Sequence, residues 1–532
     1  MSGMIIKNGL VADGTGAPPY EADIVVEGNA ILHVGRAGTV KSGMTIDARG
    51  YVVAPGFIDM HCHADFSLPI VPSADSLVHQ GITTAVIGQC GLSPAPLPRS
   101  NREDVIAGLS GILSELEGEL PWPEWSSFAD YLSFLNRIGI SINVIPLVGQ
   151  GTLRAGVMGF RAGRAGSEQM KDMQQEAVNA LEQGAWGLST GLIYPPGSYA
   201  STDELQELTQ VVADRGGFYF SHIRGESETL LDAVAEAVLI GRETKAPVQI
   251  SHFKAAGKQN WGKSKEALAL IDTARSQGLD VCPDMYPYTA GSTSLVTLLP
   301  EWAQDGGREA ILRRLSDPAL RIKMSEDMTE GGFAKSVEWD TVLITGCPGR
   351  TEYQGRFVSA LAKEANQTPH EWIFDALFEG GLQIHMAVFA MSEENRRHEA
   401  VHPAMTFCTD GMGFSASGAF MKSLTHPRSY GAFPRILSHY VREKGILSLE
   451  KAVHKMTGLA AKRLNLKDRG LIKPGFAADL VIFDPDKVRD AATYENPHQY
   501  AEGIPEVIVN GQSIIHEGLH TGLRPGLVLS RK

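Results

Sequence analysis

Cysteine is scarce in this sequence, and long apolar runs are missing from it. Only five of the 532 residues are cysteine, and no two of them form a C-x-x-C pair, so we predict reduced thiols rather than a disulfide framework. No apolar run approaches the ~18–20 residues that a membrane helix needs, and the N-terminus lacks the pattern of a signal peptide. We therefore expect a cytoplasmic protein without a membrane partner.

Basic runs and a dinucleotide-binding motif are also missing. The net charge is -13 and no segment is rich in Lys or Arg, which argues against nucleic acid as a partner. No G-x-G-x-x-G follows an expected strand, so an open doubly wound sheet is less favoured as the fold than the barrel described below. The length of the chain predicts more than one small core.

Short strands rich in β-branched residues occupy both ends of the chain. They are expected at residues 23–26, 30–34, 478–483, 507–509 and 513–515. Neither end has enough residues for a core of its own. We therefore predict one small β-sandwich that residues 1–55 and 466–532 build together.

Between these ends, over residues 56–465, apolar strands alternate with amphipathic helices. Eight strands are expected, at Tyr51–Asp59, Thr84–Gly88, Ile142–Val148, Ala185–Ser189, Gly217–Ser221, Pro247–Ser251, Leu279–Met285 and Ala404–Thr409. A helix at 167–182, for example, has Met170 and Met173 on one face. This alternation predicts the α/β class and a TIM-type (β/α)8 barrel.

A long insertion separates the seventh and eighth expected strands. It covers about residues 290–383 and contains helical stretches and a lone strand at 341–344. An insertion at this place emerges at the C-terminal face of a barrel, where active sites lie. We interpret it as lid-like, with a role in specificity; the alternative is a surface subdomain without such a role.

Residues able to bind a metal stand at the ends of five of these strands. The six residues, called the ligand set below, are His61, His63, Cys90, His222, His252 and Asp410. Side chains alternate along a strand, so His61 and His63 point the same way. A single histidine at a strand end is more often structural, but six such groups at one mouth of a barrel indicate a metal site.

The composition of the ligand set predicts zinc and hydrolysis. Imidazole and thiolate together favour zinc over calcium or magnesium. Zinc lowers the pKa of bound water to about 7, and a carboxylate must take the released proton and give it to the leaving group. Asp410 is the candidate for this general acid/base, and an amide-like bond is the expected target.

Longer motifs surround these residues. They are PGFIDMHCH at 55–63, GQCG at 88–91, GLSTGLIYPPG at 187–197, SHIRGE at 221–226, ISHFK at 250–254, DMYPYT at 284–289, TDG at 409–411 and HPRSYG at 426–431. Over essentially its whole length the chain resembles the amidohydrolase superfamily, and within it the D-aminoacylase, or N-acyl-D-amino-acid deacylase, family. The insertion after strand seven is also a feature of that family.

The resemblance implies a division of the ligand set between two metals. Cys90, His222 and His252 would hold one tight zinc, and His61 and His63 would form a second, weaker site beside it. Hydantoinase-like relatives instead bridge two metals with a carboxylated lysine on strand four. The fourth expected strand here ends without a lysine, which argues against that arrangement.

The resemblance also implies contacts with a small-molecule substrate. They would fall on Tyr194, Lys254, Tyr286, Ser292 and Arg428. Lys254 suits the α-carboxylate of the substrate. Alternatively, the two tyrosines are packing aromatics and Arg428 only fastens the loop after strand eight.

The expected reaction is removal of the acyl group from an N-acyl-D-amino acid, which gives a carboxylate and a free D-amino acid. A hydrophobic side chain is the default. The alternatives are a deacylase specific for N-acyl-D-glutamate or N-acyl-D-aspartate, a cyclic amide hydrolase of hydantoinase or dihydroorotase type, and a non-catalytic, metal-free scaffold. Gln150 stands where the family suggests Asn or His, which leaves its effect on the pocket open. Barrel surfaces often pair, so a homo-oligomer is conceivable, although no patch marks it.

Overall fold

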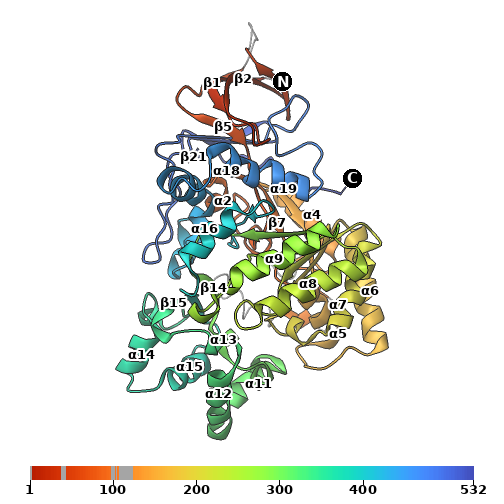
Figure 1. Ribbon diagram of the computed structural model, residues 1–532, viewed down its shortest axis with the longest axis vertical. Helices are drawn as coiled ribbons and strands as arrows, with labels where there is room; N and C mark the ends of the chain where they lie inside the picture. Colours follow the sequence, from red (N-terminus) through yellow and green to blue (C-terminus); the bar gives the residue numbers. More distant parts are fainter. Residues whose placement is uncertain (1–2, 37–42, 98–101, 104, 107–123, 532) are drawn as a thin grey trace.

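The computed structural model describes residues 3–36, 43–97, 102–103, 105–106 and 124–531 (Figure 1). From top to bottom, Figure 1 shows a β-sheet that contains strands from both chain ends, a barrel, and the insertion.

The barrel has eight strand positions, and the third is divided in two. Its strands are β6 (Phe57–Asp59), β7 (Ile82–Ile87), β8 (Asn143–Pro146), β9 (Val148–Gly149), β10 (Gly187–Gly191), β11 (Phe218–His222), β12 (Val248–Ile250), β13 (Val281–Met285) and β17 (Thr406–Phe407). Two parallel arcs, β6-β7-β8 and β9-β10-β11-β12-β13-β17, are joined by Leu147 N–H to Ile87 O (2.9 Å) and Met60 N–H to Phe407 O (3.3 Å). The predicted TIM-type barrel is thereby confirmed.

The expected strand Tyr51–Asp59 is in fact two strands in two different sheets. Residues Val52–Pro55 form β5 of the terminal sheet, and β6 begins only after Gly56. A Cβ at Gly56 would lie 2.2 Å from the Thr83 side chain, so only glycine allows the chain to pass this close to the barrel. Because the run of apolar residues is nearly continuous on both sides of Gly56, the sequence predicted one strand here instead of two.

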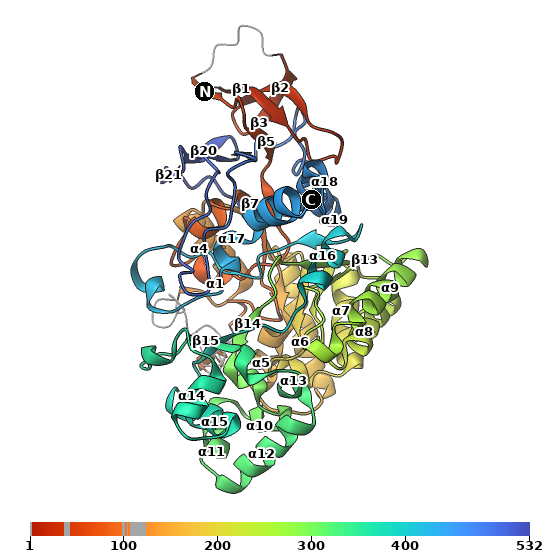
Figure 2. The same cartoon turned by 60° about the vertical axis from the view of Figure 1, so that its left-hand side comes forward.

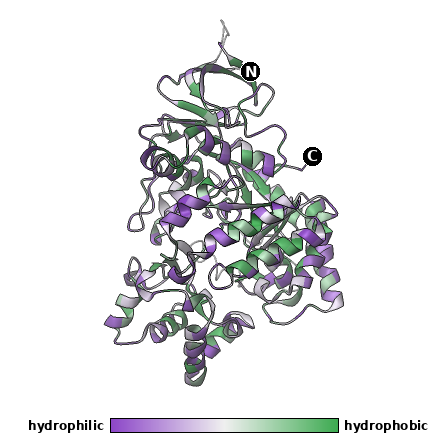
Figure 3. Ribbon diagram, viewed as in Figure 1, coloured by the Kyte–Doolittle hydropathy of each residue, from purple (hydrophilic) through white to green (hydrophobic). Residues whose placement is uncertain are grey.

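Helices cover the outside of the barrel. They are α1 (Ala64–Ser67), α2 (Asp75–Val78), α4 (Phe128–Ile138), α5 (Gln150–Met158), α6 (Ser167–Glu182), α7 (Thr202–Ala213), α8 (Leu230–Thr244), α9 (Lys263–Ser276), α16 (Glu393–Val401), α17 (Arg428–Arg435), α18 (Leu449–Met456) and α19 (Gly458–Arg463). As predicted, α6 buries Met170 and Met173. In Figure 3 the barrel strands are mainly hydrophobic, while the surrounding helices alternate in colour. Among the described residues, none of the helices has both the length and the hydropathy needed to cross a bilayer.

Both chain ends contribute to one terminal sheet. Its strands are β1 (Met4–Val11), β2 (Tyr20–Glu27), β3 (Ala30–Gly35), β4 (Met44–Asp47), β5, β18 (Leu480–Phe483), β19 (Glu506–Val509), β20 (Gln512–His516) and β21 (Leu519–His520). The two ends meet where β5 pairs antiparallel with β18, and Ile6, Val26 and Leu480 share a core. The predicted joining of the two ends is confirmed, whereas the domain limits at 55 and 465 stay predictions.

The insertion has a sheet and a hydrophobic core of its own. Its elements are β14 (Gly291–Ser294), α10 (Glu301–Gln304), α11 (Gly307–Leu315), α12 (Pro318–Glu330), α13 (Gly332–Lys335), β15 (Val342–Gly346), α14 (Val358–Glu364), α15 (Pro369–Glu379) and β16 (His385–Val388). The strand expected to be alone, β15, pairs with β16, so the insertion extends past residue 383. In Figure 2, β14 and β15 lie on the side of the insertion nearest the barrel.

Candidate metal centre

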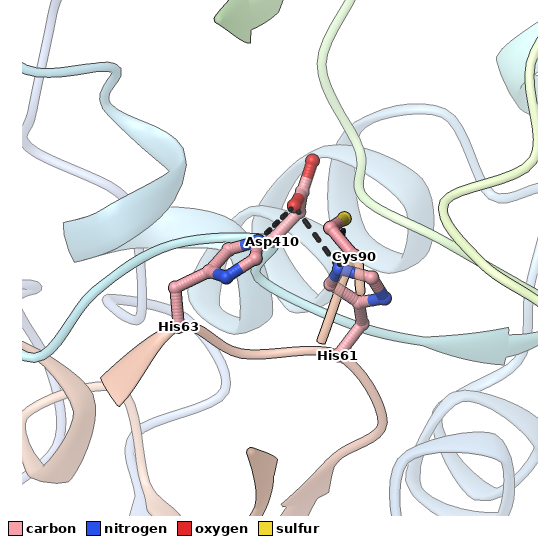
Figure 4. Close-up of side chains that lie close together, drawn as sticks. All are labelled: His61, His63, Cys90 and Asp410. Carbon is pink, nitrogen blue, oxygen red and sulfur yellow. Dashed lines mark hydrogen bonds and ion pairs between the residues drawn. The ribbon is translucent and has the colours of Figure 1, made fainter. Parts of the chain in front are cut away.

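The ligand set converges at the C-terminal ends of the barrel strands. His61 and His63 follow β6, Cys90 follows β7, His222 ends β11, His252 follows β12 and Asp410 follows β17. Figure 4 shows His61, His63, Cys90 and Asp410 pointing toward one another. Residues from five separate strands therefore meet at one point.

Two overlapping groups share the thiol of Cys90. One contains His61, His63, Cys90 and Asp410, and the other contains Cys90, His222 and His252. Cys90 Sγ lies 3.3 Å from His61 Nε2 and 3.5 Å from both His222 Nδ1 and His252 Nε2. Asp410 Oδ1 lies 3.4 Å from His61 Nε2 and 3.3 Å from His63 Nε2.

Three members of the ligand set have left-handed backbone conformations. The φ angles are +52° at Cys90, +35° at His252 and +50° at Asp410, which is unfavourable for residues with a Cβ. Such strain persists only where the surroundings hold it, and it gathers at functional sites. The strand ends are therefore shaped to aim these side chains rather than to continue the sheet.

Two buried carboxyl groups below the ligand set hold its backbone in place. Asp59 accepts hydrogen bonds from His61 N–H (3.1 Å) and Thr409 N–H (2.9 Å), and Asp284 accepts one from His252 N–H (2.7 Å). Burial raises the pKa of Asp59 to about 7 and also raises the pKa of Asp284. These contacts connect neighbouring strand ends and so maintain the ligand geometry.

Asp410 forms an ion pair with Arg428, one of the residues expected to contact the substrate. The distance from Arg428 Nη1 to Asp410 Oδ2 is 2.6 Å, and both side chains are buried. Burial alone raises the pKa of Asp410, but the charge of Arg428 and the nearby histidines outweigh it and hold that pKa well below its usual range. Asp410 is therefore ionised.

Glu226 is a candidate functional residue that the sequence did not single out. Its Oε1 lies 2.5 Å from Lys254 Nζ and 3.0 Å from His252 Nδ1, and its Oε2 lies 3.7 Å from His222 Nε2. Burial raises the pKa of Glu226, but Lys254 and the two histidines outweigh it and lower that pKa. The available signal was an acidic residue four positions after His222, inside the SHIRGE motif.

A cavity of about 600 Å³ opens above the ligand set, and the expected substrate residues line it. Tyr194 Oη lies 3.0 Å from Thr293 Oγ1 in the insertion, and Arg428 Nη2 donates to Ser292 O at 3.4 Å. The Tyr286 hydroxyl is buried and has no hydrogen-bond partner among the described residues. The five residues are thus brought together, although their roles stay predictions.

Gln150 does not line this cavity. It begins α5 and is fully buried, and a Cβ on Gly197 would lie 2.9 Å from its Oε1. Gln150 therefore packs against the loop after β10 and is not part of the pocket wall among the described residues.

The donor set fits a zinc ion. Burial lowers the pKa of His61 well below its usual range and that of His222 to about 3, so both imidazoles are neutral and keep a lone pair. Burial raises the pKa of the Cys90 thiol, and a thiolate there requires a cation beside it. A neutral-imidazole and thiolate site of this kind favours zinc.

A barrel with these groups at its C-terminal mouth and a cavity above them defines a metal-dependent hydrolase. The chain matches the amidohydrolase family over residues 44–314 and 423–515. It is 35% identical to D-aminoacylase of Alcaligenes xylosoxydans xylosoxydans over 530 residues, 99% of this chain and 97% of the relative. The chain therefore belongs to the amidohydrolase family, as a member of its D-aminoacylase group.

Two solved structures share the whole fold. A D-aminoacylase described with a binuclear metal centre, one-metal activation and second-metal attenuation has a TM-score of 0.83 and 36% identity, over 99% of both chains. The N-acyl-D-glutamate deacylase of Bordetella bronchiseptica, in complex with zinc and a phosphonate inhibitor, has a TM-score of 0.83 and 33% identity, again over 99% of both chains.

Proposed function

We propose that this protein removes the acyl group from N-acyl-D-amino acids whose side chain is neutral. The observation that carries the proposal is the meeting of the ligand set with an ionised, buried Asp410 at one end of a large cavity. The full-length likeness to D-aminoacylase supports the bond and the handedness of the substrate.

Cys90, His222 and His252 would hold one zinc tightly, and His61, His63 and Asp410 would hold a second one less tightly. Bound zinc would polarise the amide carbonyl and lower the pKa of water. Two metals are supported by the two overlapping groups around Cys90 and by the binuclear centre of the relative.

Asp410 would act as general base and then as general acid. Its carboxylate accepts a proton from the attacking water and returns it to the departing nitrogen. Arg428 keeps this carboxylate ionised between turnovers, since the two groups are only 2.6 Å apart. The amine leaves as a free D-amino acid, and the acyl group leaves as a carboxylate.

Lys254 and Tyr286 would bind the polar end of the substrate. The Lys254 ammonium has three donors, and only one is needed for Glu226 at 2.5 Å. The buried Tyr286 hydroxyl has a free donor within the same cavity. The α-carboxylate of the substrate can satisfy both groups.

The charges of the cavity wall favour a neutral side chain. Three basic side chains line the cavity among the described residues, and each is already paired: Arg224 with Glu236, Lys254 with Glu226 and Arg428 with Asp410. Glu301, which has no ion pair among the described residues, would repel an acidic substrate, whereas Leu298 and Phe333 offer apolar contact. This argues against the alternative of a deacylase specific for D-glutamate or D-aspartate.

The test is amine release by the zinc-loaded protein from N-acetyl-D-methionine, N-acetyl-L-methionine and N-acetyl-D-glutamate. We expect turnover of the D-methionine derivative, with kcat/KM at least tenfold above that of the other two. A preference for the glutamate derivative would overturn the argument from wall charges. No release from any of them would contradict the deacylase itself.

Cyclic amides are the second candidate substrates, but one observation weighs against them. Strand β10 contains no lysine, so no carboxylated lysine can bridge two metals from there, and Cys90 occupies the centre of both groups. Ring opening of hydantoin, run beside the acyl substrates, decides between the two. We also propose a cytoplasmic location, supported by five buried cysteines that form no disulfide.

A further inference from the structure

We infer that Glu226 is a positioning residue, which keeps His252 in the tautomer that binds metal and anchors Lys254 with the same carboxylate oxygen. The inference rests on the zinc site of the proposed function. It goes beyond that function because it concerns what prepares the site for zinc.

The imidazoles of His222 and His252 each face Cys90 with one nitrogen and Glu226 with the other. Toward Cys90, His222 Nδ1 and His252 Nε2 both lie 3.5 Å from Sγ. Toward Glu226, His252 Nδ1 lies 3.0 Å from Oε1 and His222 Nε2 lies 3.7 Å from Oε2. Only the His252 contact is a direct hydrogen bond. A carboxylate in this position is the usual outer partner of a zinc-binding histidine.

The location of one proton decides whether His252 can bind the metal. A neutral imidazole carries a hydrogen on one nitrogen and a lone pair on the other. An ionised carboxylate can only accept, so Glu226 stabilises the form with the hydrogen on Nδ1. That form leaves the lone pair on Nε2, the nitrogen that faces Cys90.

Lys254 favours the other tautomer of His252, the one that cannot bind the metal. Its Nζ lies 2.7 Å from the same His252 Nδ1 and 2.5 Å from Glu226 Oε1. An ammonium can only donate, so it favours a lone pair on Nδ1 and a hydrogen on Nε2, where that hydrogen blocks a metal. With side chains only 7% and 15% exposed at Lys254 and Glu226, water screens this competition little. Glu226 ends this competition, because its Oε1 accepts hydrogen bonds from both Lys254 Nζ and His252 Nδ1.

The experiment compares zinc affinities of the full chain, measured by competition with a chromophoric chelator. For Glu226→Gln we expect a 10–100-fold loss of affinity, the usual effect of removing such an outer carboxylate. Lys254→Met should stay within about threefold of wild type. The double variant should regain most of the loss, because the competing donor has gone and the glutamine oxygen can still accept from Nδ1.

Regain of affinity in the double variant is an outcome that simple loss of packing would not produce. A wild-type affinity in Glu226→Gln, or a double variant as weak as the single one, would overturn the role of Glu226. Should Glu226→Gln not fold, Glu226→Asp keeps the charge at a longer distance and should show a smaller loss. Unchanged zinc affinity in that variant would also overturn the inference.

Glu236→Gln is the matched control. Its side chain is 13% exposed and paired with Arg224 at 3.0 Å, so it resembles Glu226 in burial and pairing but does not touch the histidines. It should keep the zinc affinity of the wild type. The assay uses no substrate, so a failure to hydrolyse N-acyl-D-amino acids leaves its result intact, whereas a wild type that binds no zinc refutes the proposed zinc enzyme.

Discussion

At the scale of single residues, paired charges set the state of the site. Arg428 compensates Asp410 and Lys254 compensates Glu226, in both cases across less than 3 Å of a buried space. Burial favours the neutral form of each carboxyl, and the adjacent cation reverses that preference. The two carboxylates are thus kept ionised without solvent.

Asp410→Asn is expected to lower kcat by about 10²–10⁴-fold, the usual effect of losing a general acid/base. Asparagine keeps the shape but can neither accept nor return the proton. The measurement is amine release, with zinc content determined on the same sample, because Cys90, His222 and His252 should retain the tight ion. Near-normal turnover in this variant would remove Asp410 from the mechanism.

A second carboxylate paired with an arginine serves as the control for Asp410. Asp490 lies 3.2 Å from Arg435 Nη1 and outside the cavity lining. Asp490→Asn should therefore keep its turnover, which separates loss of proton transfer from loss of a buried charge pair.

At the scale of elements, hydrogen bonds from residues at the barrel mouth connect the insertion to the barrel. Strand β14 contributes Thr293 and Ser292, which bond to Tyr194 and Arg428, and it pairs with β16. The stability of this small sheet therefore affects the wall of the cavity. The lid-like role of the insertion stays a prediction.

His385 in β16 makes this element sensitive to acid. Burial lowers its pKa to about 4, whereas in the unfolded chain it titrates near 6.5. Between these two pH values the unfolded state binds more protons than the folded state. The contribution of His385 to the free energy of unfolding is therefore fully present above pH 6.5 and falls as the pH drops toward 4. The loss amounts to roughly 3 kcal/mol at most.

His385→Gln should reduce that acid sensitivity. We expect the difference in Tm between pH 7 and pH 5, measured on zinc-free protein, to be smaller than in the wild type. The exposed His33 offers a control, since His33→Gln should leave the wild-type difference in place. An unchanged difference in His385→Gln would show that the ring is not held neutral in the fold.

At the scale of the whole molecule, one buried network joins the terminal sheet to the barrel. Asp479, just before β18, forms an ion pair with Arg469. It also accepts hydrogen bonds from Asn510 N–H (2.7 Å) and from Asn143 Nδ2 (3.1 Å) at the start of β8. The C-terminal part of the chain thus fastens the barrel at the end opposite the metal centre.

Asp479→Ala should lower the free energy of unfolding by about 3–5 kcal/mol, because it removes the buried carboxylate that pairs with the buried Arg469. Urea denaturation measures the change. As a control, Glu502→Ala removes an exposed carboxylate paired with Arg489 at 2.7 Å and should cost about 1 kcal/mol or less. Equal effects of the two variants would contradict the importance of the network.

Much of the fold and of the site follows from local patterns. Alternating apolar strands and amphipathic helices predict the barrel, and polar residues directly after strands predict the ligand set, because parallel strands must end at one face. The sequence placed the border between sandwich and barrel after residue 55 but took Tyr51–Asp59 as one strand, since the steric contact with Thr83 that divides it comes from another segment.

By itself, the sequence determined the barrel, the joining of the two chain ends, and the six metal-competent residues that meet at the barrel mouth, because these depend on periodicity and on residues at strand ends. Only the tertiary structure decided how charges pair. Arg428 meets Asp410, and Glu226 meets both Lys254 and His252. Such pairs depend on loop conformations, including the left-handed backbone at His252 and Asp410, and no local pattern encodes the distances between loops from different strands.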